Sequence, residues 1–270
     1  MQSPTLAILI LILLPFAVRA DESLKMIEPK SKVIKPFNGT NLEGFTTWLR
    51  EQDRFEHSEA YSVVDGTIRI AGKGMGYIAT VNAYRNYHLS IEYRWGERTD
   101  GSKYVRNSGI LLHATGPEGN ARGTWMASVE VQLAQGCEGD LIVIRGEDDA
   151  GKTIPVTLSS RTIVAEDSRT RWREDGAPTV YSGRQFWWSH HEAGFEELRD
   201  TRGKNDVASP LGEWTKVECI CEGNEITVKI NGQIVNHCYD VFPAAGRILL
   251  ENESSEVYFR NFEIRPLPAP

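Results

Sequence analysis

The chain has 270 residues, of which 40% are hydrophobic, 25% charged and 9% aromatic, with 24 glycines. This ordinary globular composition excludes a mainly disordered, collagen-like or coiled-coil chain. The formal net charge is −7. Because nucleic-acid phosphates require a basic face, we do not expect a nucleic-acid partner.

The first 20 residues are typical of an export signal. Residues 6–16 are almost wholly apolar but too short to span a bilayer comfortably, and Val18-Arg19-Ala20 resembles a signal-peptidase site. We expect a signal peptide at 1–20, a polar leader or linker at 21–36, and one domain at 37–268. The protein is then exported, periplasmic or secreted, with no membrane span in the mature chain. An uncleaved N-terminal anchor is the alternative.

Short strand patterns alternate with turns along the rest of the chain. Asp65-Gly66 separates two β-rich runs and predicts a hairpin. Residues 87–95 alternate, with Tyr87, Leu89, Ile91 and Tyr93 on one face. Further strands are expected at 108–113, 128–133, 141–145, 216–222, 226–231, 233–237, 247–251 and 256–265. Many short strands without alternating helices predict an all-β sandwich or jelly roll.

The stretch 148–210 departs from this strand rhythm and is rich in Arg, Asp, Gly and Trp. We expect a long loop insertion at a binding rim, with at most a short helical piece near 192–198.

Four cysteines stand at positions 137, 219, 221 and 238. Export permits disulfides. Cys219 and Cys221 share one face of a strand and cannot pair with each other, whereas either could meet Cys238. No CxxC motif occurs, which disfavours a zinc knuckle.

The run from Trp125 to Leu133 holds the most informative polar pair. Glu130 and Gln132 are two residues apart and therefore share one face of a strand, with the apolar neighbours on the other. A carboxylate beside an amide can bind sugar hydroxyls, and Glu130 can act as a general acid or base. A solvated outer face is the competing interpretation.

Three other features are candidates for a site. His113 is expected on the same strand face as Gly109 and Leu111, where a neighbouring Glu130 would tune it toward base chemistry. Asp140 follows a Gly-rich turn, which suits turn chemistry, a carboxylate at a cleft edge or a metal ligand. Trp187 and Trp188 can stack on sugars or cover the core.

The order of several motifs resembles the 3-keto-disaccharide hydrolase domain family, from about Phe37 to Leu267. These motifs are Phe37-Asn-Gly-Thr-Asn-Leu-Glu-Gly-Phe45, Asn107-Ser-Gly-Ile110, Val129-Glu-Val-Gln132, Gly212-Glu-Trp214, Asn231-Gly232 and Val257-Tyr-Phe-Arg-Asn261. The resemblance implies a concanavalin A-like β-jelly-roll sandwich of two antiparallel sheets, with a concave sugar-binding face. It also implies bacterial export and carbohydrate turnover.

The resemblance also implies site residues. The family's recurring acidic and polar positions match His113, Glu130, Gln132, Asp140 and Glu253. This chain departs from the family at Glu251, where glutamine is usual. An extra carboxylate there can change substrate choice or metal affinity.

A 3-keto sugar suggests cleavage by elimination. The ketone acidifies the hydrogen on C2, a base removes it, and the group at C1 leaves, with or without later addition of water. His113 or Glu130 is the candidate base, and Asp140 or Glu253 the acid or a metal ligand. Gln132, Arg94 or a divalent metal would steady the enolate.

Candidate substrate-binding residues are Arg94, Asn107, Gln132, Trp187, Trp188, Glu251 and Glu253. The sequence establishes no cofactor, and a divalent metal at His113, Glu130 and Asp140 stays open. A conventional two-carboxylate glycosidase and a non-catalytic carbohydrate-binding module are the main alternatives. A third is a surface protein whose 148–210 loop serves a protein partner.

Overall fold

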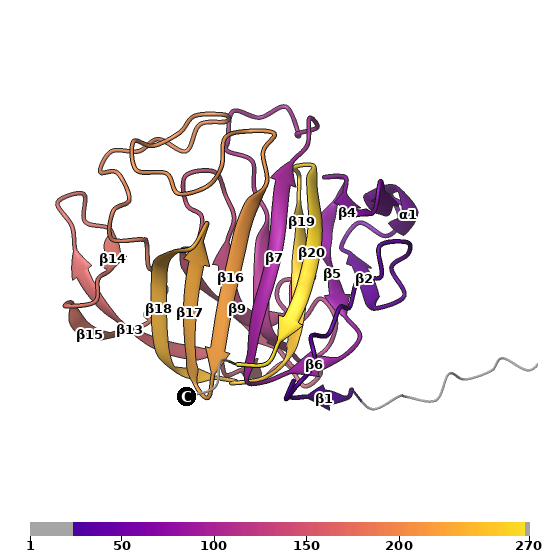
Figure 1. Ribbon diagram of the computed structural model, residues 1–270, viewed down its shortest axis with the longest axis horizontal. Coiled ribbons are helices and arrows are strands. Elements are labelled where there is room, and N and C mark those ends of the chain that lie inside the picture. Colours follow the sequence, from indigo (N-terminus) through magenta and orange to yellow (C-terminus); the bar gives the residue numbers. More distant parts are fainter. Residues whose placement is uncertain (1–23, 268–270) are drawn as a thin grey trace, which may run out of the picture.

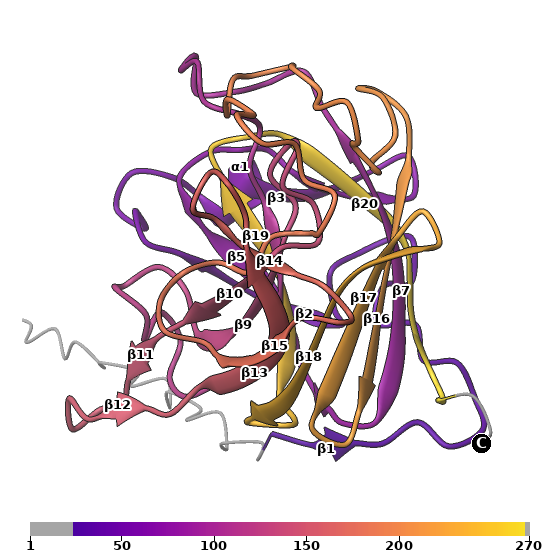
Figure 2. The ribbon, with the colours of Figure 1, turned by 90° about the vertical axis from the view of Figure 1, so that its left-hand side faces the viewer.

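The computed structural model describes residues 24–267, which form two facing sheets of mainly antiparallel strands (Figures 1 and 2). The six-stranded sheet has the order β10 (Leu141–Ile144), β9 (Ala127–Gln132), β8 (Gly109–Thr115), β19 (Arg247–Glu253), β5 (Met75–Thr80) and β2 (Phe45–Leu49).

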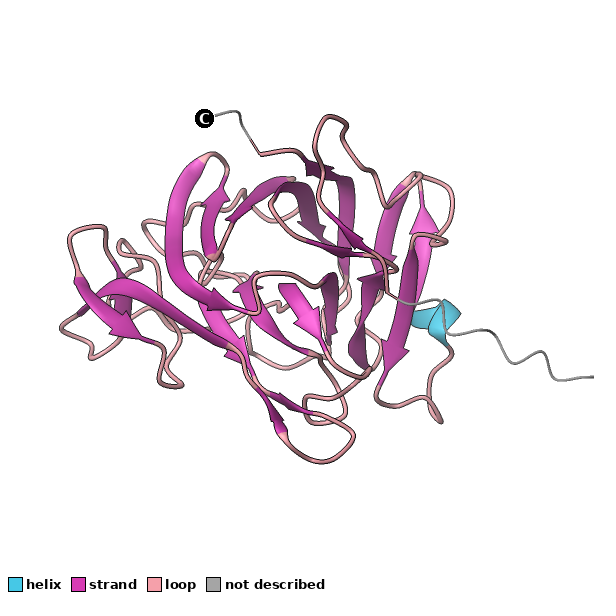
Figure 3. Cartoon of the chain, turned by 90° about the horizontal axis from the view of Figure 1, so that it is seen from below, coloured by secondary structure: helices cyan, strands magenta, loops and turns pink. Residues whose placement is uncertain are grey.

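The large sheet faces the six-stranded sheet. Its order is β14 (Thr170–Trp172), β13 (Thr157–Val164), β18 (Gln233–Phe242), β17 (Glu225–Ile230), β16 (Thr215–Glu222), β7 (Tyr87–Trp95), β20 (Val257–Arg265), β4 (Thr67–Ile70) and β3 (Tyr61–Val64), with β15 (Ala177–Val180) paired to β13. Two small pairs complete the strands: β1 (Met26–Ile27) with β6 (Ala83–Tyr84), and β11 (Gly146–Glu147) with β12 (Thr153–Ile154). A short helix, α1 (His57–Ala60), lies at the periphery (Figure 3).

The core lies between the two sheets because each strand turns alternate side chains inward. The six-stranded sheet contributes Ile110, Leu112, Val129, Val131, Ile248 and Leu250, and the large sheet Leu89, Ile91, Val217, Val228 and Phe259. The opposite, outer face of the six-stranded sheet therefore receives the intervening residues. Some of these form a second apolar cluster of Tyr77, Ala79, Leu111, Ala114, Met126 and Leu249. The remaining polar ones build the site.

The predicted jelly-roll sandwich is confirmed, and so are most predicted strands. β7 covers residues 87–95 as predicted, with its alternate residues Tyr87, Leu89, Ile91 and Tyr93 in the core. The β3–β4 hairpin turns at Asp65 and Gly66, whose φ angles of 49° and 71° suit the tight turn that Asp-Gly favours.

The expectation of a structureless insertion at 148–210 is wrong in its first half. β12 to β15 lie within it, and β13 extends the large sheet by pairing with β18. From 181 to 214 no strand forms, and no helix forms at 192–198. The alternation of Leu158, Ser160 and Thr162 as buried residues supports β13, but polar neighbours and many turns obscure it in the sequence.

The predicted signal peptide at 1–20 lies outside the described residues. Part of the predicted leader is attached to the domain: β1 pairs in parallel with β6, and Ile34 exchanges backbone hydrogen bonds with Ile264. Among the described residues, no helix is long and apolar enough to cross a membrane. The four cysteines are buried and unpaired.

Candidate functional site

Three glutamates gather on the outer face of the six-stranded sheet. Glu130 comes from β9, and Glu251 and Glu253 come from β19, while β8 lies between these two strands. On this face of β8, Leu111 is the register partner of Glu130, and Gly109 is the next residue on the same face. A Cβ atom at Gly109 would stand 2.5 Å from Oε2 of Glu251 and 3.1 Å from Oε1 of Glu130. The missing side chain is therefore what lets carboxyl groups from β9 and β19 meet above β8.

Burial decides the protonation of this glutamate cluster. Glu130 is 5% exposed and Glu251 only 1%. Burial raises the pKa of both carboxyl groups, and the charge of neighbouring glutamates raises it further. Burial also raises the pKa of Glu253, although a hydrogen bond from the Asn107 side chain opposes the shift. Because like charges so close disfavour one another's ionisation, these carboxyl groups keep their protons to higher pH than a free glutamate does.

Two hollows lie near the cluster, and Glu253 lines the smaller one. A cavity of about 140 Å³ is lined by Glu253, Asn107, Tyr104 and Met75, among others. A groove of about 520 Å³ runs over β10, where Ile142 stands opposite Glu130 in the strand register. Met75, the register partner of Glu253, lines both hollows. The groove is large enough for a small carbohydrate.

The groove is polar and partly aromatic. Its lining includes Arg50, Arg122, Trp125, Arg145 and Tyr181. Burial raises the pKa of Tyr181 and the charge of Glu130 adds to the rise, whereas a backbone hydrogen bond at Val143 and the charge of Arg145 oppose it. Tyr181 is thus within electrostatic reach of Glu130, and Tyr181 and Arg145 can orient a ligand bound in the groove.

Gln132 lies on the predicted face, two residues from Glu130. Its Oε1 accepts hydrogen bonds from the backbone N–H groups of Leu133 and Ala134, at 2.9 and 3.0 Å. The amide oxygen is therefore occupied, and only the NH₂ group remains to donate to a ligand.

The prediction that His113 shares the face of Gly109 and Leu111 is wrong. A bulge in β8 between Leu112 and Thr115 breaks the alternation, and His113 has a φ of 57°. Its ring packs against Tyr87 in the core, and Nδ1 lies 3.0 Å from the Pro243 carbonyl oxygen. Burial lowers the pKa of His113 to about 4. The structure does not bring His113 to Glu130, so it is no longer our candidate base.

Asp140 also lies apart from the glutamate cluster. Its carboxylate accepts a hydrogen bond from Nε2 of Gln185 at 2.6 Å and another from the backbone N–H of Trp188 at 3.0 Å. These contacts attach the 181–214 segment to the turn before β10. The expectation of Asp140 as a catalytic acid is therefore corrected to an anchoring role.

Two further substrate-binding expectations need correction. Arg94 lies on β7 in the large sheet and stacks on Trp214 and Tyr258, with centroid distances of 4.8 and 5.5 Å. Trp187 and Trp188 are buried, which supports the core-covering alternative rather than sugar stacking. None of the three lines the groove or the cavity beside the glutamates.

The proposed metal set of His113, Glu130 and Asp140 does not converge. Among the described residues, the only three His, Cys, Asp or Glu side chains whose donor atoms lie mutually within 4.8 Å are Cys137, Asp140 and His191. The glutamate cluster does not meet this condition. We therefore assign no metal to it and derive no step through one.

Several site residues escaped prediction, above all Gly109, Met75, Tyr104, Trp125, Arg145 and Tyr181. Gly109 had a usable signal, because an isolated glycine inside a strand often marks a close approach. The others come from separate loops and strands, and no local spacing links them.

Comparison with solved structures reveals distant similarity. A protein from Parabacteroides distasonis, provisionally described as a glycosyl hydrolase, is 18% identical, with 87% of this chain and 94% of that chain covered and a TM-score of 0.49. The carbohydrate-binding module CBM66 from Bacillus subtilis is 9% identical, with 81% and 93% covered and a TM-score of 0.44. The β-glucanase of Bacillus licheniformis is 10% identical, with 88% and 98% covered and a TM-score of 0.43. Similarity at this level does not transfer an activity.

No curated protein matches the chain. A family model does, over residues 32–265, and this range includes the glutamate cluster, the groove and the 181–214 segment. The resemblance found from the sequence motifs is thereby confirmed, and the chain belongs to the carbohydrate-active family described as the 3-keto-alpha-glucoside-1,2-lyase-like domain.

Proposed function

We propose that this protein is an exported enzyme that cleaves 3-keto-glycosides or 3-keto-disaccharides by elimination. One observation carries the proposal: Glu130, Glu251 and Glu253 form a buried cluster with raised pKa values beside a carbohydrate-sized groove. Such a cluster supplies a base and an acid in one place, which elimination requires.

The chemistry follows from the 3-keto group. An ionised glutamate removes the proton from C2, and the electron pair forms an enolate with the C3 oxygen. The C1–O bond then breaks, and a protonated glutamate gives its proton to the leaving oxygen. Ending here gives an unsaturated keto sugar, a lyase product. Addition of water across the new double bond gives net hydrolysis.

The access of a ligand to each glutamate indicates the role of that glutamate in the proposed reaction. Glu253 lines the 140 Å³ cavity and is the carboxyl group that a ligand can touch. Glu130 lies deeper and exchanges the proton with it, and Glu251, only 1% exposed, is the most deeply buried of the three. The Asn107 side chain beside Glu253 and the NH₂ group of Gln132 are donors that can hydrogen-bond to the enolate oxygen.

The test is turnover of a 3-keto-disaccharide beside its unoxidised parent, with product masses measured with and without a chelator. We expect cleavage of the keto form alone. Glu130→Gln and Glu253→Gln should each lower kcat/KM by about 10²-fold or more. Glu222→Gln, at an exposed strand end, is the matched control and should keep full activity.

Other outcomes would contradict the proposal. Cleavage of both sugars would indicate a conventional glycosidase, and binding without turnover of either would indicate a carbohydrate-binding module. Export is tested separately by intact mass of the protein from its native host. A mass that retains residues 1–20 contradicts a cleaved signal.

A further inference from the structure

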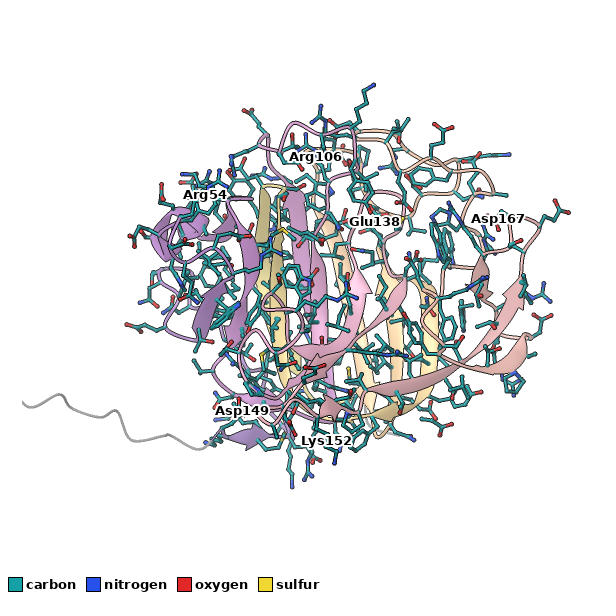
Figure 4. The ribbon with its side chains drawn as sticks, turned by 180° about the vertical axis from the view of Figure 1, so that it is seen from behind. Arg54, Arg106, Glu138, Asp149, Lys152 and Asp167 are labelled. Carbon is teal, nitrogen blue, oxygen red and sulfur yellow. The ribbon has the colours of Figure 1, made fainter. Side chains whose placement is uncertain are left out.

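A second cluster of reactive side chains lies away from the glutamates. Cys137 and Asp140 belong to the turn between β9 and β10, and His191 belongs to the 181–214 segment. One donor atom from each lies within 4.8 Å of the other two. Figure 4 marks this turn by Glu138 and the β13–β14 connection by Asp167.

The surroundings of His191 orient its ring and leave one ring nitrogen available to bind a metal ion. Its ring is held edge-on against Trp187, with centroids 4.2 Å apart, and against Phe195 at 5.4 Å. Nδ1 lies 3.3 Å from the Glu192 carbonyl oxygen and can donate to it. Nε2 is shielded from solvent and has no hydrogen-bond partner among the described residues. A neutral imidazole oriented by a backbone carbonyl, with one free lone pair, is the usual state of a metal-binding histidine.

Asp140 is oriented in a comparable way. Gln185 and the Trp188 backbone each donate to one of its oxygens, which leaves further lone pairs for a cation. Both donors lie in the same segment as His191, so this segment positions two of the three ligands. The carboxylate is fully buried, a position that favours a paired or coordinated charge.

The charges around the cluster permit a cation. The negative charges of Glu138 and Glu197 are within electrostatic reach of Cys137, and that of Glu197 is also within reach of Asp140. Two arginines oppose a cation, but both have partners. Arg171 is paired with both oxygens of Asp167 at 2.6 and 2.7 Å, and Arg169 stacks on Trp187 at 3.9 Å.

We propose that Cys137, Asp140 and His191 form a binding site for a divalent cation of borderline softness, with Zn²⁺ as the expected ion. Thiolate, carboxylate and imidazole are the ligands that zinc takes, and tetrahedral coordination needs donors about 3.3–3.6 Å apart. Small side-chain movements suffice to close the present spacing. The fourth ligand would be a water molecule, and a cavity of about 10 Å³, close to the smallest that holds one water, lies beside His191.

The site would fasten the 181–214 segment to the turn that follows Gln132. Its expected contribution is structural, and it is independent of the elimination proposed for the glutamates. The experiment that tests the site therefore measures metal binding and not turnover.

The experiment uses the mature chain purified without a histidine tag, stripped with a chelator and then given Zn²⁺ or Co²⁺. After desalting we expect about one Zn²⁺ per chain by elemental analysis. The Co²⁺ form should show the absorption of a thiolate-to-cobalt charge transfer and of tetrahedral coordination. The melting temperature should rise with added Zn²⁺.

Two variants have matched controls. Cys137→Ala and His191→Ala should lose the bound Zn²⁺, whereas Cys219→Ala, another buried thiol, and His190→Ala, the adjacent histidine, should keep it. The proposal is overturned if the wild-type chain retains less than about 0.2 Zn²⁺, or if His191→Ala retains as much as wild type. Should the variants not fold, an absent thiolate band in wild-type Co²⁺ protein overturns it equally.

Discussion

Gly109 and the side chain of Glu251 approach each other so closely that a methyl group on Gly109 would stand 2.5 Å from Oε2 of Glu251. This contact is shorter than carbon and oxygen can tolerate, and Glu251 is enclosed on its other sides. The absence of one side chain on β8 is thus a condition for the glutamate cluster.

Gly109→Ala should therefore damage the site. We expect a loss of roughly 1–3 kcal/mol in the free energy of unfolding, because overpacking forces Glu251 or the strand to move. Chemical denaturation measures the loss. The matched test repeats the change in a Glu251→Ala background, where the methyl group has room and should cost at least 1 kcal/mol less, by the usual size of coupling between contacting residues. Equal costs in both backgrounds would contradict the contact.

Glu251→Gln should stabilise the protein at neutral and alkaline pH. Burial and neighbouring glutamates raise the pKa of Glu251 well above 4.5. The folded state therefore binds more protons than the unfolded state, so stability falls as pH rises from about 4.5 toward the raised pKa. Glu251→Gln removes this loss of stability. At pH 8 we expect the free energy of unfolding to rise by roughly 1–3 kcal/mol, or Tm to rise by about 2–10 °C.

The same variant should have almost no effect at pH 4, where Glu251 is protonated in both states. Thermal melts across this pH range measure the difference, with Glu222→Gln as the exposed control. Glutamine keeps the size and the hydrogen-bonding oxygen of Glu251, so we expect Glu251→Gln to keep activity. The acid limb of its kcat/KM profile should stay in place, because burial keeps Glu251 protonated in the pH range where Glu130 ionises. A limb displaced to lower pH would show that Glu251 carries a negative charge beside Glu130.

His113 should act on stability rather than on chemistry. Burial lowers its pKa to about 4, so the unfolded state binds the extra proton between that value and about 6.5, and stability falls as pH drops through this window. His113→Asn tolerates the left-handed backbone and removes the titration. Its stability should depend less on pH between 6.5 and 4, by about 2–3 kcal/mol.

Activity provides the second measurement for His113. At a temperature where His113→Asn is folded, we expect kcat/KM within about threefold of wild type. A loss of 10²-fold or more in folded protein would restore His113 as a base.

Arg145 and Arg94 lie on different sides of the molecule, so variants of these two residues test which sheet binds the sugar. Arg145 lines the groove beside Tyr181, whereas Arg94 stacks on Trp214 across the large sheet. Arg145→Ala should raise KM for a 3-keto-disaccharide by about 5- to 30-fold, the equivalent of 1–2 kcal/mol for one charged hydrogen bond. Arg94→Ala should leave KM unchanged. Steady-state kinetics of the two variants decides which face binds the sugar, and the reverse order of effects would place the site on the large sheet.

The strands were predicted well where the alternation of apolar and polar residues matches the alternation of buried and exposed positions. β7, with one apolar and one polar face, was predicted to the residue. Asp65-Gly66 located the β3–β4 hairpin, because few other residues adopt those backbone angles. β13 was missed because its buried positions include serine and threonine, whose polarity hides the alternation.

The site could be predicted only in part. Strand alternation correctly placed Glu130 and Gln132 on the face opposite Val129 and Val131. The same rule failed at His113, because a single bulged residue reverses every side chain after it. Nothing in the local sequence announces that bulge.

By itself, the sequence determined the class of fold, the family and the polar candidates Asn107, Glu130, Gln132, Glu251 and Glu253, because hydrophobic periodicity and motif order are properties of the chain. Only the tertiary structure decided which of those residues meet. Glu130 and Glu251 are 121 positions apart along the chain, and they come together because β8 inserts between β9 and β19 with a glycine where their carboxyl groups approach. Strand order and long-range register arise from the packing of the whole sandwich, which no local pattern encodes.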